Sequence, residues 1–207
     1  MPANSTPLRR RPVQQRSAAR VERMLEACAN LIEEVGYDGV TTTLIAERAG
    51  VAVGSLYQFF PDKRAVVQAL TMRNLDQFMD MIANRIGSAQ LDHWWDAVDM
   101  VFDAYVSMYR EVPGFTQIRF GDVVDLRLMD DQRDNNTVIA DRLAGLLTTR
   151  FNLDLDELRL PISVSVEIAD GILNLAFRRK LFSEDVVIAE ARRVVRAYLS
   201  GHLEPQH

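Results

Sequence analysis

Apolar residues recur every three or four positions along most of this chain. Between residues 17 and 35 this spacing places a single apolar face on a predicted amphipathic helix. The residues of that face are Val21, Met24, Leu25, Cys28, Leu31, Ile32 and Val35. Ser17 is suited to cap the start of the helix and Gly36 to end it, because glycine tolerates the backbone conformation that follows a helix end.

Two shorter helices are predicted next, joined by a tight turn at Gly50 and Val51. Thr41 is placed to cap the first of them, and the second spans about residues 53–60. Pro61 ends the second helix, because the residue before a proline is pushed out of the helical conformation. The side chains that we expect to face inward, with the first helix as a third wall, are Ile45, Ala46, Ala49, Val51, Leu56 and Phe60.

The rest of the chain also predicts helices. A long helix begins after Pro61 and reaches about residue 86, with inward residues Val66, Val67, Leu70, Leu75, Phe78 and Ile82. Further helices are expected near residues 91–111, 115–128, 132–150, 157–181 and 184–201, with breaks at Pro113-Gly114, at Asn152 and at Phe182-Ser183. Residues 161–166 alternate in the manner of a strand, but the sequence offers them no partner strand and the helical spacing continues beyond them. The predicted fold is therefore all-α.

The composition is that of a soluble globular protein, with 48% hydrophobic and 26% charged residues. No apolar run reaches the roughly 18 residues that a bilayer span needs, and the first residues lack the apolar segment of a secretory signal. The single cysteine, Cys28, excludes an intrachain disulfide and a thiolate metal cluster. We therefore expect a cytoplasmic protein that has no membrane partner, no metal and no cofactor.

The net charge of −5 is unevenly distributed along the chain. Residues 1–64 carry a charge of +2 and the remainder carries −7. Residues 1–16 form a basic arm that we expect to be disordered. A basic arm on a near-neutral domain, followed by an acidic body, allows contact with DNA at one end of the molecule only.

The second short helix leaves an unusual group of side chains outside. With Leu56 and Phe60 turned inward, the residues expected wholly or partly on the solvent side are Val53, Ser55, Tyr57, Gln58 and Phe59. Exposing Val, Tyr and Phe together is costly on an ordinary surface but suits a helix placed in the major groove of DNA. There Val53 and Phe59 can contact thymine methyl groups, while Ser55 and Gln58 can hydrogen-bond to base edges.

Groups suited to phosphate contacts flank this helix. Thr41, Thr42 and Thr43 offer hydroxyl and N–H groups at a helix start, which is the positive end of the helix dipole. Tyr57 can donate its phenolic proton to a phosphate, and Lys63 can donate from its ammonium group. Gly54 permits a close approach of the backbone to DNA or to the neighbouring helix. The segment from Thr41 to Lys63 is therefore predicted to be a helix-turn-helix that reads duplex DNA.

Residues 17–64 resemble the N-terminal DNA-binding domain of the TetR family of repressors. The matching positions are Gly36, Tyr37, Thr41, Ile45, Ala46, Ala49, Gly50, Val51, Gly54, Leu56, Tyr57, Phe60 and Lys63. The sequence departs from the family at Ala52, where Ser or Thr often caps the recognition helix, and at Leu44, an outward position that is often polar.

This resemblance implies a three-helix DNA-binding domain over residues 17–64, a long linking helix, and a helical body within residues 65–207 that binds a ligand and dimerises. It also implies a transcriptional regulator, most commonly a repressor, that binds a palindromic operator as a homodimer and responds to a small-molecule effector. By the same resemblance, DNA contacts fall to Thr41, Thr42, Ser55, Tyr57 and Lys63.

Aromatic side chains crowd the helix predicted near residues 91–111. We interpret them either as the lining of an apolar, aromatic cavity for the effector or as ordinary core residues. The candidates are Trp94, Trp95, Phe102, Tyr105, Met108 and Phe120. Because Trp94 and Trp95 are adjacent, they lie about 100° apart on a helix and cannot both point the same way.

The last two helices of TetR-family members pair with their symmetry mates. The residues here that suit such a self-complementary face are Ile168, Ile172, Leu175, Val187, Ala191 and Val194. The alternative is that this stripe faces the core of its own body.

Two other functional classes explain fewer features of the sequence. An enzyme is disfavoured, because the chain has no Ser/His/Asp or Cys/His signature and no Gly-rich phosphate loop. A helical ligand-binding or scaffold protein without DNA binding accounts for the body but leaves the exposed side chains of the second short helix unexplained. We therefore predict a DNA-binding transcriptional regulator.

Overall fold

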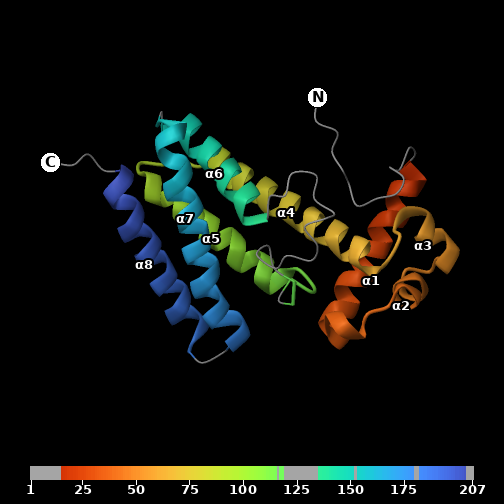
Figure 1. The fold of residues 1–207 in the computed structure, drawn as a ribbon. Helices are drawn as coiled ribbons and strands as arrows, with labels where there is room; N and C mark the ends of the chain where they lie inside the picture. Colours follow the sequence, from red (N-terminus) through yellow and green to blue (C-terminus); the bar gives the residue numbers. More distant parts are fainter. Residues whose placement is uncertain (1–14, 116, 119–134, 152, 180–181, 204–207) are drawn as a thin grey trace. The chain divides into compact units, whose positions relative to one another are not determined.

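The structure is a computed structural model, and it describes residues 15–115, 117–118, 135–151, 153–179 and 182–203. This described part consists of helices and their connections, without strands, which confirms the all-α prediction (Figure 1). In chain order the helices are α1 (Gln15–Gly39), α2 (Thr42–Arg48), α3 (Val53–Phe59), α4 (Lys63–Ser88), α5 (Trp94–Glu111), α6 (Asn135–Phe151), α7 (Leu155–Asn174), a π-helical turn (Leu175–Arg179) and α8 (Glu184–Leu203). The helix predicted near residues 115–128 lies almost wholly outside the described residues.

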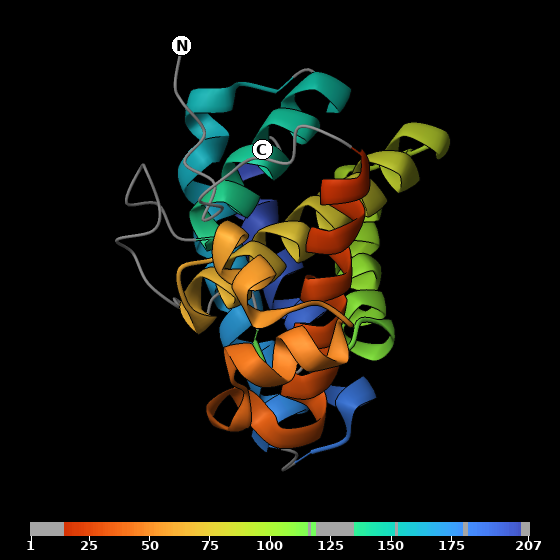
Figure 2. The same cartoon turned by 90° about the vertical axis from the view of Figure 1, so that its right-hand side faces the viewer.

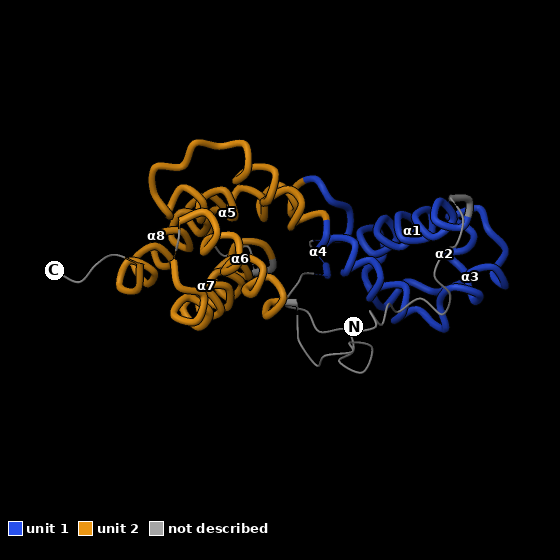
Figure 3. Tube along the Cα trace, turned by 90° about the horizontal axis from the view of Figure 1, so that it is seen from above, with its two compact units in different colours: residues 1–76, 111–134 blue, residues 77–110, 135–207 orange. Residues whose placement is uncertain are grey.

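The chain divides into two compact units (Figure 3). Unit 1 contains residues 1–76 and 111–134, and unit 2 contains residues 77–110 and 135–207. Helix α4 begins in unit 1 and continues without interruption into unit 2. The division predicted from the sequence, with segments 1–16, 17–64 and 65–207, stays a prediction.

The core of unit 1 is built by α1, α2, α3 and the beginning of α4. In Figure 2, α2 and α3 (orange) lie beside α1 (red). All six inward residues predicted for the short helices lie in or against this core, and Ile45, Leu56 and Phe60 are fully buried. The inward residues predicted for α4 are buried as well. The three-helix arrangement and the long helix that follows it are therefore confirmed.

Helix α1 differs from its prediction at both ends. It begins at Gln15, so Ser17 lies inside the first turn instead of capping it, because Gln and Arg are good helix formers and extend the helix. The helix breaks as predicted at Gly36, whose φ of 72° favours glycine. Val35 was expected to face inward but is 51% exposed; it is the last residue before this break.

The chain also turns at Gly114, as predicted, and passes close to α1. Gly114 has a φ of 73°, and a Cβ atom at this position would lie 2.6 Å from the backbone carbonyl oxygen of Ala29. Only glycine fits both the backbone conformation and the close contact. The predicted core role of Cys28 is confirmed too: it is fully buried, and burial raises the pKa of its thiol to about 12.

Unit 2 is a bundle in which α7 packs against both α6 and α8 (Figure 1). The strand-like segment at residues 161–166 is helical, and Pro161 is accommodated inside α7. Asp154 caps α7 by accepting a hydrogen bond from the Asp156 N–H at 2.8 Å. The predicted break at Phe182-Ser183 separates the π-helical turn from α8.

Candidate nucleic-acid interface and apolar cavity

The start of α2 is capped as the sequence predicts. Thr41 has an extended backbone, and its Oγ1 accepts a hydrogen bond from the Leu44 N–H at 3.2 Å. Thr41 and Thr43 are exposed and Thr42 is half-buried. The three predicted phosphate-binding threonines therefore lie together at the positive end of a helix dipole.

A glycine-dependent turn connects α2 to α3. Gly50 has a φ of 65°, and its N–H donates to the Glu47 carbonyl at 3.0 Å. The Val51 N–H donates to the Ala46 carbonyl at 2.9 Å, which completes a Schellman motif. Val51 then packs against the core, so the turn sets the direction in which α3 leaves α2.

Helix α3 exposes most of the surface that was predicted to read DNA. Gly54, Tyr57 and Gln58 are exposed, and Ser55 is half-buried. Val53 is half-buried and packs against the core with part of its side chain. Ala52 stands at the N-cap without a side-chain hydrogen bond, as its apolar side chain requires.

Phe59 was expected on the solvent side of α3, and this expectation is wrong. The side chain is only 7% exposed and belongs to the core of unit 1. Residues three and four positions apart share one face of a helix, so Phe59 lies on the same face as Leu56. This spacing was available in the sequence, and it indicates a core role for the Phe59 ring.

A hydrogen bond links the exposed faces of the two short helices. Thr42 Oγ1 and the Tyr57 hydroxyl are 3.0 Å apart, and either can be the donor. The bond holds the Tyr57 hydroxyl next to the start of α2. The two hydroxyls and the α2 N-terminus thus form a polar rim beside the exposed surface of α3.

Lys63 is anchored at the start of α4. Its Nζ donates a hydrogen bond to the Tyr37 carbonyl at 3.0 Å and lies 4.3 Å from the centroid of the Tyr37 ring. This pairs an ammonium with both a carbonyl oxygen and an aromatic face. An ammonium has three donors, so the bond to Tyr37 still allows Lys63 to donate to a phosphate oxygen.

An ion pair that was not predicted from the sequence connects α2 to α1. The Arg48 guanidinium donates to both carboxylate oxygens of Glu34, at 2.7 and 2.8 Å. This paired geometry holds the pKa of Glu34 below its usual value, chiefly through the hydrogen bonds. The two residues are 14 positions apart, so no local spacing rule reveals them.

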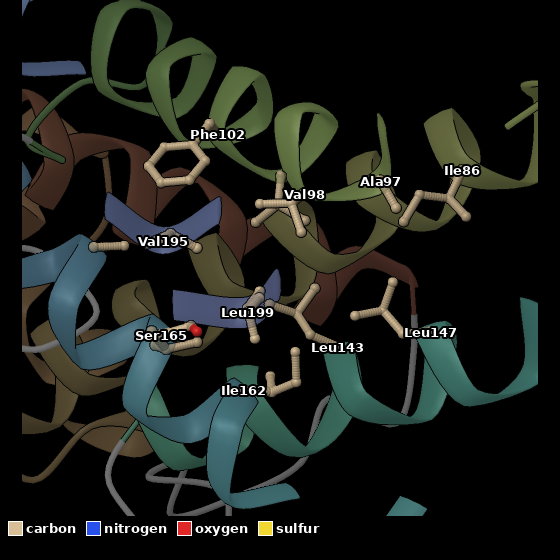
Figure 4. Close-up of a pocket in the computed structure, with 13 residues that line it drawn as sticks. Ile86, Ala97, Val98, Phe102, Leu143, Leu147, Ile162, Ser165, Val195 and Leu199 are labelled. Carbon is tan, nitrogen blue, oxygen red and sulfur yellow. The ribbon is translucent and has the colours of Figure 1, made fainter. Parts of the chain in front are cut away.

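Unit 2 contains an apolar cavity of about 70 Å³ (Figure 4). Helices α4 to α8 all contribute to its wall. The residues that line it are Ile86 from α4; Ala97, Val98, Val101 and Phe102 from α5; Leu143 and Leu147 from α6; Ile162, Ser165, Val166 and Ala169 from α7; and Val195 and Leu199 from α8. The wall is almost entirely aliphatic, with Phe102 as its aromatic member and Ser165 as its hydroxyl.

The predicted aromatic lining is largely wrong for this cavity. Phe102 is part of the wall, whereas Trp94, Tyr105 and Met108 are buried elsewhere in unit 2. These three share the inward stripe of α5 with the cavity residues but lie one or two turns away along the helix axis. Phe120 lies outside the described residues.

Tyr105 and Trp95, which were also predicted to line the cavity, pack against other rings instead. The Tyr105 ring lies 6.3 Å from the rings of both Phe78 and Phe177. Trp95 is half-buried, stacks on His93 at 3.9 Å and lies under the Arg196 guanidinium at 4.4 Å. Trp94 and Trp95 thus point in different directions, as their adjacency on a helix requires.

The predicted dimer stripe is also only partly available. Val187 and Ala191 are 6% and 0% exposed, because they share the inward face of α8 with Val195 and Leu199. They belong to the core of unit 2, as the alternative interpretation of this stripe expected. The other four residues, Ile168, Ile172, Leu175 and Val194, remain half-buried at the surface of α7, the π-helical turn and α8.

Both parts of the chain match domains of one known family. Residues 24–70 match the family described as bacterial regulatory proteins, tetR family. Residues 92–203 match the tetracyclin repressor-like C-terminal domain. A solved TetR-family transcriptional regulator from Streptomyces coelicolor has 39% sequence identity and a TM-score of 0.77, over 91% of this chain and 99% of that one.

Curated relatives are similar to this chain over only part of their length. The HTH-type transcriptional regulator BetI of Escherichia coli is 37% identical over 78 residues, which is 35% of this chain and 40% of BetI. The tetracycline repressor class A from transposon 1721 is 47% identical over 47 residues, or 23% of this chain and 22% of the repressor. The chain thus spans less than half the length of the curated relatives that it matches.

The C-terminal match alone covers more than half of the chain, and the solved regulator is similar along nearly its whole length. These matches agree with the helix-turn-helix geometry of α2 and α3 and with the helical bundle of unit 2. The chain therefore belongs to the TetR family of DNA-binding transcriptional regulators.

Proposed function

We propose that this protein is a repressor that binds a palindromic operator as a homodimer and is released from it by a small, apolar effector. The observation that carries the DNA-binding part is the exposed face of α3 beside the hydrogen-bonded rim of α2. Gln58 and Tyr57 are exposed on this face, and Thr42 holds the Tyr57 hydroxyl at 3.0 Å.

Within this interface we assign base contacts to Ser55 and Gln58, whose polar groups can bond to base edges in the major groove. The part of Val53 that remains exposed suits a thymine methyl group. Gly54 adds no side chain, and no atom lies within 4 Å of the position that a Cβ would occupy, so the backbone is open to DNA. Phosphate contacts fall to Tyr57, Lys63 and the α2 threonines Thr41, Thr42 and Thr43.

The homodimer is supported by the apolar surface of α7 and α8. One described helix, Leu155–Phe177, is long and apolar enough to cross a membrane by length and composition, and 33% of its most apolar stretch is buried within this chain. Apart from Val35, Leu44 and Tyr57 in unit 1, the exposed large apolar residues of the described chain are Leu155, Leu160, Phe182 and Val186. A second copy of the same surface would cover these residues from water.

The effector is assigned to the cavity of unit 2, and α4 is the element that can transmit its binding. Ile86 on α4 lines the cavity, and Lys63 begins the same continuous helix. A ligand that displaces the cavity end of α4 would change the spacing of the two α3 helices in the dimer. Half-sites must lie about one helical turn apart, so a shift of a few ångströms weakens operator binding. A coupling of about 1–3 kcal/mol is typical of such switches.

The test is binding of the purified full chain to a labelled duplex from the region upstream of its own gene. We expect a mobility shift with the mass of a dimer on one operator, and an affinity that falls steeply as salt rises, because phosphate contacts release counterions. Unrelated DNA of equal length is the control. No shift at low salt with any duplex from the host genome would exclude DNA binding by this chain.

A further inference from the structure

The cavity of unit 2 contains one buried hydroxyl that the fold itself leaves without a partner. Ser165 on α7 lines the cavity and is only 5% exposed. Among the described residues, no group forms a hydrogen bond with its Oγ. Figure 4 shows the Ser165 oxygen on the side of the residue that faces Leu199, another wall residue.

Several other hydroxyls on the helices of this chain bond to the backbone of their own helix. Ser163 Oγ donates to the Arg159 carbonyl at 2.8 Å, and Ser200 Oγ donates to the Arg196 carbonyl at 2.9 Å. Thr71 does the same with Val67 at 3.0 Å. This is the usual way for a serine or threonine to be satisfied inside a helix. Ser165 departs from it, and a buried polar group left unpaired is costly enough to call for an explanation.

The rest of the wall restricts what the cavity can hold. The other lining residues are aliphatic, apart from Phe102, and none carries a charge. A charged ligand would lose its hydration without gaining an ion pair, which is strongly unfavourable. A pure hydrocarbon would fit the wall but would leave the Ser165 hydroxyl unpaired.

We propose that the effector is a small, neutral, largely aliphatic molecule with a single hydroxyl or carbonyl group, and that Ser165 forms a hydrogen bond with that group. This inference rests on the effector part of the proposed function. The cavity of about 70 Å³ exceeds the about 10–15 Å³ that one water needs and is smaller than the about 150 Å³ that holds benzene. A chain of about four carbon atoms with one oxygen is the matching size.

Three probes of equal heavy-atom count test this chemistry: 1-butanol, 2-butanone and n-pentane. Each is titrated into the full-length protein with ¹³C-labelled methyl groups, and the shifts of Leu143, Leu147 and Val195 report occupancy. Affinities are compared between variants for one probe at a time, so that differences in water solubility cancel. We expect Ser165→Ala to weaken 1-butanol and 2-butanone by about two- to tenfold, the usual effect of one neutral hydrogen bond, and to leave n-pentane unchanged.

Two further variants control for the position and for the fold. Ser163→Ala lies two residues away and removes a hydroxyl that is bonded to its own helix, so it is expected to leave all three affinities unchanged. Ala169→Leu fills the cavity from α7 and is expected to weaken all three probes. Ser165→Ala removes an unpaired hydroxyl, so its thermal melting is expected to match or exceed that of the wild type.

The possible results separate clearly. Selective loss of the two oxygen-containing probes in Ser165→Ala supports the proposal. Equal loss of all three probes, or no loss of any, overturns the role of Ser165. Unchanged methyl shifts with all probes at millimolar concentration show that the cavity is a packing void and overturn the site. Operator binding is measured separately, so a failure of DNA binding and a failure of ligand recognition are distinguishable.

Discussion

Two exposed neighbours on α3 are expected to play different parts in DNA binding. The Tyr57 hydroxyl is held by Thr42 at the rim of α2, where phosphates are expected. Gln58 has a side-chain amide that can bond to adenine through a donor and an acceptor together. We therefore expect Gln58 to recognise a base and Tyr57 to contact the DNA backbone.

We expect Tyr57→Phe to lower affinity by a similar factor for every operator sequence. Gln58→Ala should instead reduce discrimination at one base pair by about 1–3 kcal/mol. The measurement is competition binding against a set of operators with single base changes. An unchanged base preference in Gln58→Ala would show that another residue reads that position.

Phe59 is expected to contribute to stability. Its ring is buried in the core of unit 1, so Phe59→Ala should lower the free energy of unfolding by about 3–5 kcal/mol. Urea denaturation followed by circular dichroism measures this change. The neighbouring exposed variant Gln58→Ala is the control and should change stability by no more than about 0.5 kcal/mol. A Phe59→Ala protein of normal stability that fails to bind DNA would contradict the burial of this ring.

The two short helices differ in the residues that stabilise their ends. Helix α2 has seven residues, a Thr41 cap and a Schellman turn at Gly50. Helix α3 also has seven residues but lacks a side-chain cap at Ala52 and contains Gly54. Because a short helix has little stability of its own, α3 is held chiefly by the packing of its buried face.

Gly54 provides a test in which stability and DNA binding change in opposite directions. Its position is exposed and helical, and a Cβ would meet no atom within 4 Å, so Gly54→Ala should raise the free energy of unfolding by up to about 1 kcal/mol. The same methyl group should weaken operator binding if the α3 backbone approaches DNA closely. Thermal melting and mobility shift measure the two effects.

Gly145→Ala on α6 is the matched control for this variant. Gly145 also lies in a helix with open space around its missing Cβ, and it belongs to unit 2, whereas Gly54 belongs to unit 1. It should gain stability without a change in operator affinity. An unchanged affinity in Gly54→Ala as well would show that the α3 backbone stays away from DNA.

At the scale of the whole molecule, dimerisation is expected to use the outer surface of α7 and α8. Ile168→Asp places a charge on the half-buried surface of α7, and we expect it to convert the dimer into a monomer with weakened operator binding. Sedimentation velocity measures the oligomeric state. Asn84→Asp is the control, because it adds the same charge at an exposed position of α4, outside the proposed interface. A dimer that persists in Ile168→Asp would place the interface elsewhere.

The sequence alone determined the features that depend on near neighbours in the chain. The cap at Thr41, the breaks at Gly36 and Gly50 and the stop at Pro61 were all predicted, because each arises from the backbone preferences of one or two residues. Helical spacing likewise predicted most of the core of unit 1, with Val35 and Phe59 as exceptions. The same local motif carried the resemblance to the TetR family, which the comparisons then confirmed.

Tertiary structure decided where each inward face finds its neighbours. A periodic pattern shows which side of a helix is apolar. It does not show which turns on that side pack against another helix and which line a cavity. The cavity therefore formed among mainly aliphatic residues of five helices, while Tyr105 on the same stripe of α5 packed against the rings of Phe78 and Phe177. Val187 joined the core for the same reason. Ser165 lines a cavity that only the assembled bundle creates, and its hydroxyl finds no hydrogen-bond partner within the described part of the chain.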